Sequence, residues 1–345
     1  SMLKVEKAAV LGAGTMGAAI AAHLTNAGIP TLLLDIADTD ENAKSKNAKV
    51  ESMFAAAKKL KPAPFMLAKN ANLITLGNFE DDMEKIADCD IVIEAVIELL
   101  DIKHKIFGEV EKYRKPGAVI ASNTSGIPIK DIAEPFSDDF KKHFLGTHFF
   151  NPPRYMPLVE IIPHSTTRSD VMDNVEAFLV STLGKGVVRA KDTTNFIANR
   201  IGVFSILVTL YHAERLGINF ETVDELTGSK IGRPKSATLR TADVVGLDTL
   251  RHVSNGVVDN LKDDPWADLF KVPAWMDTLV DSGALGAKTK KGVFKKEGRE
   301  ILVFEAKDGS YRKRKIKIPS KVEKLIKDFK NPDRLANLRA TKDPH

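Results

Sequence analysis

Short apolar runs alternate with longer polar or amphipathic segments along the first half of the chain. Apolar runs of this length are typical of buried strands, and the segments between them are long enough to form helices. The pattern predicts strands at residues 8–11, 31–34, 73–76, 91–96, 118–122, 144–150 and 158–162, with helical segments at 41–60, 81–87, 101–113 and 169–183. Strands that alternate with helices form a parallel sheet covered on both faces, so we expect an α/β fold.

The pattern changes after Ala190, where the apolar residues no longer come in short runs. Residues 195–216 predict one long helix that is apolar on every side, which is typical of a buried helix. Further helical segments follow at 221–227, 237–244 and 247–260. We therefore predict three regions: an α/β domain over residues 1–190, an all-α C-terminal domain over 191–300, and a basic extension over 301–345 that begins a linker to missing domains.

A glycine-rich turn, Gly12-Ala13-Gly14-Thr15-Met16-Gly17, separates the first strand from the first helix. Gly12 permits the tight turn, Gly14 lets the backbone approach a pyrophosphate, and Gly17 lets the helix pack closely on the strand. The amides at the helix N-terminus then point at the phosphates. The complete strand–helix–strand unit predicts a Rossmann-type dinucleotide-binding domain, with Thr15 and Met16 among its cofactor-binding residues.

Asp35 follows the second apolar run, about 20 residues after the glycines. A carboxylate at this position accepts hydrogen bonds from the two free hydroxyls of an adenosine ribose. It would repel a 2′-phosphate. The sequence therefore predicts that the cofactor is NAD rather than NADP.

The composition is that of a globular protein with about two domains. The chain has 345 residues, of which 43% are hydrophobic and 28% are charged, values that allow a substantial core. No apolar run approaches the length of a membrane span, and residues 1–4 contain no apolar targeting region. Cys89 is the single cysteine, which excludes an intramolecular disulfide and a cysteine metal cluster. We expect a cytoplasmic protein that uses no metal and does not bind membranes.

Positive charge is concentrated between Lys307 and Lys330, a segment that contains ten Lys or Arg residues and three acidic residues. The net charge of the whole chain is +5, so the remainder of the chain carries a small negative charge. Aromatic groups that could stack on bases are sparse in this segment, which argues against a nucleic-acid partner. Three readings stay open: a solvated strand and helix, a contact with ligand phosphates, and a docking surface for an acidic neighbouring domain.

Polar residues follow several of the predicted strands, at the sheet edge where α/β proteins bind their ligands. They include Glu94, Glu98, the segment 122–125 and His148. Glu160 differs from these because it lies between Val159 and Ile161 inside an apolar strand, where a buried carboxylate needs a partner.

His148 is the expected partner of Glu160. It lies twelve residues earlier, and the proline-rich segment 152–157 joins the two strands. A carboxylate that holds one imidazole nitrogen fixes the tautomer and leaves the other nitrogen as a base. The pair therefore predicts acid–base chemistry beside the nucleotide site.

Five motifs together resemble the 3-hydroxyacyl-CoA dehydrogenase family. Their order and spacing match from about Lys7 to about Lys296, and they are Gly12–Gly17, Ser122–Ser125, His148–Pro152, Leu158–Glu160 and Asn195–Arg200. The resemblance implies a Rossmann-type domain followed by a helical domain. It also implies NAD-dependent oxidation of (S)-3-hydroxyacyl-CoA to 3-ketoacyl-CoA in fatty-acid β-oxidation.

The resemblance assigns a role to each matching residue. His148 is the base that removes the proton of the 3-hydroxyl, and Glu160 orients it. Around the substrate hydroxyl and carbonyl the resemblance places Ser125 and Asn199. Near the nicotinamide and its ribose it places Glu98, Lys103 and Asn123, and Asn151 shapes the site. The reaction needs substrate and nicotinamide held together, so we expect a cleft between the two domains.

Some positions depart from the shorter members of the family. Thr194-Asn195 stands where they have a proline–glycine pair, and Gly126 replaces the second serine of a Ser-Ser pair. Together with the segment 232–248, these departures are similar to a long form in which an enoyl-CoA hydratase-like domain accompanies the dehydrogenase. The chain would then be a fragment that forms a homodimer or docks with missing C-terminal domains.

Two other readings remain open at this stage. A β-hydroxyacid dehydrogenase acting on a non-CoA substrate shares both domain types, but those enzymes usually use a lysine on the long helix, where this chain has Asn199 and Arg200. A non-catalytic NAD-binding relative would keep the fold without turnover. The His148–Glu160 pair argues against this second reading.

The cofactor preference is directly testable. We predict that the protein uses NADH far better than NADPH, because Asp35 would repel the 2′-phosphate. Replacing Asp35 with Ser and Ile36 with Arg should narrow or invert the ratio of kcat/KM values for the two cofactors. Equal use of NADPH by the unaltered protein would show that Asp35 does not select against the 2′-phosphate.

Overall fold

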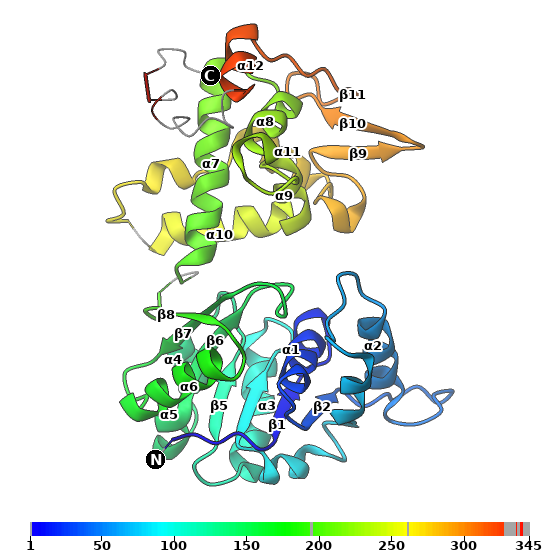
Figure 1. Ribbon diagram of the computed structural model, residues 1–345, viewed down its shortest axis with the longest axis vertical. Coiled ribbons are helices and arrows are strands. Elements are labelled where there is room, and N and C mark those ends of the chain that lie inside the picture. Colours follow the sequence, from blue (N-terminus) through cyan, green and yellow to red (C-terminus); the bar gives the residue numbers. More distant parts are fainter. Residues whose placement is uncertain (1, 194–195, 261, 328–335, 337–338, 341–345) are drawn as a thin grey trace. The chain divides into compact units, whose positions relative to one another are not determined.

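The computed structural model describes residues 2–193, 196–260, 262–327, 336 and 339–340 (Figure 1). The chain divides into two compact units, residues 1–197 and 198–345. The sequence places this division at residue 190. The segment after residue 190 stays with the first unit because the amide of Ile197 bonds to Glu160 in the sheet.

The first unit is built on an eight-stranded sheet with the order β3-β2-β1-β4-β5-β6-β7-β8. The strands are β1 (Ala8–Leu11), β2 (Thr31–Asp35), β3 (Ile74–Asn78), β4 (Ile91–Glu94), β5 (Val119–Ser122), β6 (Phe144–Phe149), β7 (Leu158–Pro163) and β8 (Gly186–Arg189). Neighbouring strands are parallel except β6 and β7, which are antiparallel. The carboxyl ends of β1, β4, β5 and β6 therefore share one edge of the sheet.

Helices cover both faces of this sheet, as the sequence predicts (Figure 1). They are α1 (Thr15–Asn26), α2 (Ala48–Lys58), α3 (Leu100–Tyr113), α4 (Ile129–Ala133), α5 (Asp138–His143) and α6 (Ser169–Ser181). Alternate residues of β1 enter different cores. Ala8 and Val10 pack with residues of α1, α2 and α6, whereas Ala9 and Leu11 pack with residues of α3, α4 and α5. This arrangement confirms the doubly wound α/β fold.

Two helix predictions for the first unit were wrong, one in its starting residue and the other in the type of helix. The helix expected over residues 41–60 begins only at Ala48, because the side chains of Asp38 and Asp40 accept amides two residues ahead and hold turns there. The helix expected over residues 81–87 is a 3-10 helix, Met83–Asp88. Strand β8 was not predicted, since its residues are mostly exposed and lack an apolar pattern.

The second unit is helical, as predicted, and also contains a small antiparallel sheet. Its helices are α7 (Ala198–Leu216), α8 (Phe220–Thr227), α9 (Leu239–Val245), α10 (Leu247–Asn260), α11 (Ala274–Asp281) and α12 (Ser320–Lys327). The sheet has the order β11-β10-β9, with β9 (Phe294–Glu297), β10 (Glu300–Phe304) and β11 (Tyr311–Lys313). Residues 300–313 are therefore folded onto the helical core through Val303 and Phe304, and are not a linker.

Helix α7 is less buried than its composition predicts. It buries one stripe, Val203, Leu207, Leu210 and Ala213, whereas Ile201 on another side is 62% exposed. The prediction of a helix buried on every side was wrong. None of the helices in the described part of the chain has the length and hydrophobicity that crossing a bilayer would require.

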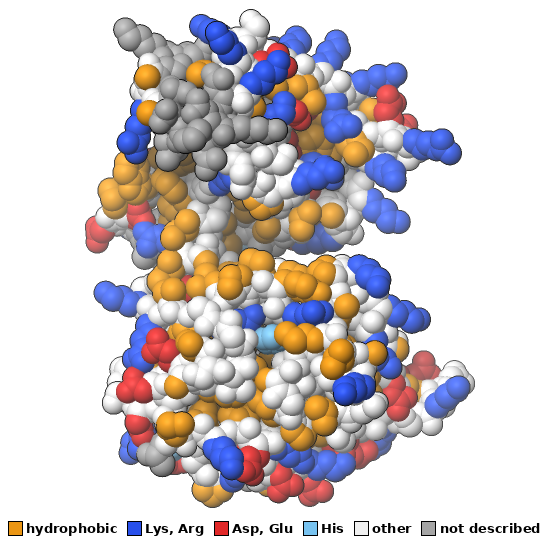
Figure 2. All heavy atoms as spheres, viewed as in Figure 1, with side chains coloured by type: hydrophobic (Ala, Val, Ile, Leu, Met, Phe, Trp, Pro, Cys, Tyr) orange, Lys and Arg blue, Asp and Glu red, His pale blue; other side chains and the backbone are white. Residues whose placement is uncertain are grey.

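The basic segment is partly used inside the second unit. Arg312 on β11 pairs with Glu221 of α8 at 2.5 Å and with Glu305 at 2.9 Å, and the Glu221 side chain is almost fully buried. Burial alone would raise the pKa of Glu221, but hydrogen bonds from Arg312 and from the amide of Lys315 outweigh it and hold the pKa below its usual value. Figure 2 shows other Lys and Arg side chains gathered where β9, β10 and β11 lie.

We predict that Arg312→Gln lowers the free energy of unfolding by about 2–4 kcal/mol, because it leaves the buried Glu221 carboxylate without its cation. Lys313→Gln is the matched control, since Lys313 pairs with Glu300 at the surface and should change stability little. Denaturation by urea measures both. Equal stabilities of the two variants would contradict a structural role for Arg312.

Candidate active site

The glycine-rich turn is built for close approach of backbone to backbone. A Cβ at Gly17 would lie 1.8 Å from the carbonyl oxygen of Gly12, and one at Gly12, where φ is +106°, would lie 2.5 Å from the carbonyl oxygen of Ala95. A Cβ at Gly14 would meet no protein atom within 4 Å. No side chain caps the first turn of α1, and no acidic residue lies in that turn. The open space at Gly14 and the uncapped amides fit a pyrophosphate.

Asp35 lies at the end of β2 with its carboxylate turned toward this glycine-rich turn. One carboxylate oxygen accepts the amide of Ala13 at 2.6 Å, and the other accepts the amide of Ile36 at 2.6 Å. The residue is only partly buried. The carboxylate is therefore held at the position where the sequence predicts the adenosine ribose, and these residues fit a dinucleotide.

His148 and Glu160 face each other across β6 and β7. The antiparallel register places them directly opposite, and Nδ1 of His148 lies 3.1 Å from Oε1 of Glu160. Both residues are buried, with 5% and 1% of their surface exposed. An ionised carboxylate only accepts hydrogen bonds, so this contact favours the tautomer of a neutral imidazole that carries its proton on Nδ1 and its lone pair on Nε2. The predicted pairing is confirmed.

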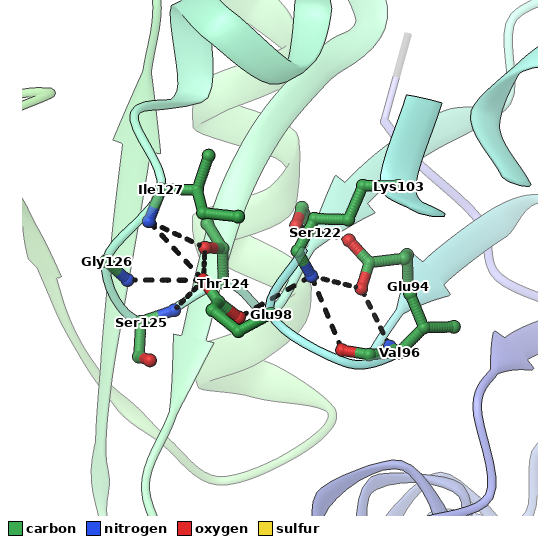
Figure 3. A network of polar contacts seen from close by, with 9 residues as sticks. All are labelled: Glu94, Val96, Glu98, Lys103, Ser122, Thr124, Ser125, Gly126 and Ile127. Carbon is green, nitrogen blue, oxygen red and sulfur yellow. Dashed lines mark hydrogen bonds and ion pairs between the residues drawn. The ribbon is translucent and has the colours of Figure 1, made fainter. Parts of the chain in front are cut away.

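A second buried carboxylate, Glu94, ends strand β4 (Figure 3). Its oxygens accept from Nζ of Lys103 at 2.7 Å, from the hydroxyl of Ser122 at 2.6 Å and from the amide of Val96 at 2.8 Å. Burial raises the pKa of the Glu94 carboxyl, while the Lys103 ammonium and these hydrogen bonds oppose the rise. Glu94 thus ties the ends of β4 and β5 to helix α3.

Glu98 extends this network toward the surface (Figure 3). Its carboxylate accepts from the hydroxyl of Thr124 and, at 3.3–3.4 Å, from the amides of Ser125, Gly126 and Ile127. Lys103 lies 3.6 Å from it and is itself completely buried, whereas the Glu98 side chain is 39% exposed. Glu98 is therefore the member of this charged group that can meet a ligand.

The other expected site residues are placed unevenly. Asn123 follows β5, and its side-chain oxygen accepts the amide of Phe149, so it holds the end of the strand that carries His148. Ser125 and Asn151 lie at the same edge of the sheet in exposed loops. Asn199 is half-buried in the first turn of α7, in the second unit. Thr194-Asn195 falls outside the described residues.

The sequence motifs include Glu94, Phe196 and Ile197, but the sequence does not predict the contacts that these residues make. Glu94 ends an apolar strand just as Glu160 interrupts one, and that shared signal marks a buried carboxylate in need of a cation. Phe196 and the amide of Ile197 contact His148 and Glu160, as described below. No sequence pattern reports a backbone amide that bonds to a distant side chain.

Comparison with known proteins identifies relatives across nearly the whole chain. The NAD-binding domain model of 3-hydroxyacyl-CoA dehydrogenase matches residues 7–193, and the C-terminal domain model matches residues 196–296. A Bacillus subtilis protein named "probable 3-hydroxyacyl-CoA dehydrogenase" is 48% identical over 92% of this chain, which spans only 42% of that protein. A Deinococcus radiodurans protein of the same name is 47% identical over 85% of this chain and 84% of its own length.

A solved structure is also similar. The crystal structure of the (S)-3-hydroxybutyryl-CoA dehydrogenase of Ralstonia eutropha superposes with a TM-score of 0.70 at 30% identity. The match covers 84% of this chain and 98% of that one. The shared architecture therefore extends through both units of the chain.

Two glycine variants separate folding from cofactor binding. We predict that Gly17→Ala destabilises the fold, because the new Cβ would overlap the Gly12 carbonyl. Gly14→Ala should fold normally, because its Cβ meets no protein atom, and should weaken NAD binding by filling the space beside the uncapped amides. Thermal melting and calorimetric titration with NAD measure the two effects. Unchanged NAD affinity in Gly14→Ala would contradict the assignment.

Proposed function

The chain belongs to the 3-hydroxyacyl-CoA dehydrogenase family, and we propose that it catalyses the NAD-dependent oxidation of (S)-3-hydroxyacyl-CoA to 3-ketoacyl-CoA. The observation that carries the proposal is the buried His148–Glu160 pair, which lies at the same edge of the sheet as the dinucleotide turn. An alcohol is oxidised when it loses a proton and a hydride. The pair supplies a group for the proton beside a site for the hydride acceptor.

His148 takes the proton of the 3-hydroxyl on Nε2 in this mechanism. Glu160 holds Nδ1 and stabilises the imidazolium that forms, so the ring stays in the required orientation and tautomer. NAD, when bound, supplies the hydride acceptor. In the reverse direction His148 returns the proton to the ketone. A well-placed base of this kind contributes roughly 10²–10⁴-fold to the rate.

The cofactor would be held by residues that follow the ends of β1, β2, β4 and β5 and by Lys103 of α3. The uncapped amides of α1 would bind the pyrophosphate, and Asp35 would accept from the adenosine ribose. We propose, from the family resemblance, that Glu98, Lys103 and Asn123 lie near the nicotinamide and its ribose. Because Lys103 is buried between two carboxylates, it acts in this conformation by neutralising Glu94 and orienting Glu98.

The substrate contacts rest on the resemblance. Ser125 and Asn199 would bind the hydroxyl and carbonyl groups of the acyl chain, and Asn151 would shape the pocket beside His148. A role in fatty-acid β-oxidation, a homodimer, and an accompanying enoyl-CoA hydratase-like domain stay predictions. The steering of coenzyme A phosphates by residues 307–330 would depend on cations other than Arg312, which is committed to Glu221.

The test is the oxidation of NADH with 3-ketoacyl-CoA esters of graded chain length, followed by absorbance. We predict that His148→Gln lowers kcat by roughly 10²–10⁴-fold, because the base is lost while the shape is largely kept. NAD affinity, measured by calorimetry, should change little. Glu160→Gln should lower kcat less.

His143→Gln is the matched control for this experiment. His143 is also buried, but it lies at the opposite end of β6, before the strand begins. It should keep the activity of the unaltered protein. A normal rate in His148→Gln, or no turnover of any 3-ketoacyl-CoA by the unaltered protein, would reject the proposed function.

A further inference from the structure

Phe196 has a backbone conformation that phenylalanine rarely adopts. Its φ angle is +52°, in the left-handed region, and only 2% of the residue's surface is exposed. Glycine adopts this conformation without steric cost, whereas a side chain with a Cβ is disfavoured there. Strained residues of this kind persist where the surrounding structure requires them, often at functional sites. The contacts of Phe196 and Ile197 show why the surrounding structure holds Phe196 in this conformation.

The left-handed turn directs the next amide at Glu160. The dihedral angles of Phe196 set the orientation of the peptide unit that joins it to Ile197. The N–H of Ile197 donates to Oε2 of Glu160 at 2.9 Å, while Oε1 of the same carboxylate faces Nδ1 of His148 at 3.1 Å. Glu160 therefore has each oxygen engaged by a different partner, which fixes the plane of the carboxylate.

The ring of Phe196 contacts the imidazole directly. The two ring centroids lie 5.7 Å apart with an interplanar angle of 58°, and the ring of Phe150 lies 4.5 Å from the imidazole. Phe196 also belongs to the buried cluster that contains Phe140 and Phe144. The imidazole is thus held at Nδ1 by a hydrogen bond and against its ring by two aromatic side chains.

We propose that Phe196 and the amide of Ile197 are positioning elements for the His148–Glu160 pair. The amide fixes the carboxylate, and the ring limits the rotation of the imidazole, so Nε2 is presented in one orientation. A glycine at position 196 would allow the turn but leave the imidazole unsupported, which explains why a phenylalanine occupies a strained position. The inference rests on the proposed function only in treating His148 as the base.

The experiment compares Phe196→Leu with Phe140→Leu. Both residues are buried in the same cluster, but the ring contacts of Phe140 are with Phe107, Phe136 and Phe144 rather than with His148. We expect Phe196→Leu to lower kcat roughly 10-fold, since small misplacement of a catalytic group is costly, with KM for NAD nearly unchanged. Phe140→Leu should lower the melting temperature by a similar amount and keep kcat. Phe196→Gly should lower kcat further.

A second measurement does not depend on turnover. In ¹⁵N-histidine-labelled protein without substrate, the His148 signals, assigned with His148→Gln, should show the Nδ1–H tautomer alone. Phe196→Leu should give a mixture of tautomers, and Phe140→Leu should not. If Phe196→Leu matches Phe140→Leu in both kcat and tautomer, the inference is wrong. If the unaltered protein fails to turn over 3-ketoacyl-CoA while the tautomers respond as expected, the proposed function fails and the positioning role stands.

Discussion

A carboxylate buried inside a sheet must have hydrogen-bond donors around it, and Glu160 imposes that constraint on the first unit. Its side chain is 1% exposed, and its two oxygens draw on different parts of the chain, His148 on the adjacent strand and the amide of Ile197. A one-residue slip of β6 against β7 would turn His148 to the opposite face and leave Glu160 unpaired. The same carboxylate therefore selects the strand register, the imidazole tautomer and the path of the chain as it leaves the sheet.

Glu94 on β4 applies the same constraint three strands away from Glu160. It is fully buried, and its cation, Lys103, comes from helix α3 rather than from the sheet. The lysine also lies near Glu98, which reaches the loop that carries Ser125. The buried carboxylate of Glu94 thus positions Lys103, and Lys103 in turn helps to position the partly exposed carboxylate of Glu98 (Figure 3).

Glu221 shows the same chemistry in the second unit, where its partner is Arg312 of the small sheet. The pairing joins helix α8 to strand β11, so residues 300–313 are part of the folded helical unit. Not all of the positive charge of that segment is available to a ligand or partner, because Arg312 is paired with Glu221 inside the unit. The neighbouring Lys313 is largely exposed.

The sequence by itself determined those features that depend on local pattern. The period of apolar runs specified the sheet, the glycine spacing specified the dinucleotide turn, and one hairpin-like connection between β6 and β7 sufficed to place His148 beside Glu160. Tertiary structure decided the contacts between segments far apart in the chain. Lys103 meets Glu94 only because α3 packs beside β4, Arg312 meets Glu221 across 91 residues, and the Ile197 amide meets Glu160 across 37. Such pairings produce no periodic pattern in the sequence. They are selected because a buried charge loses its hydration, and that loss occurs only when the chain packs.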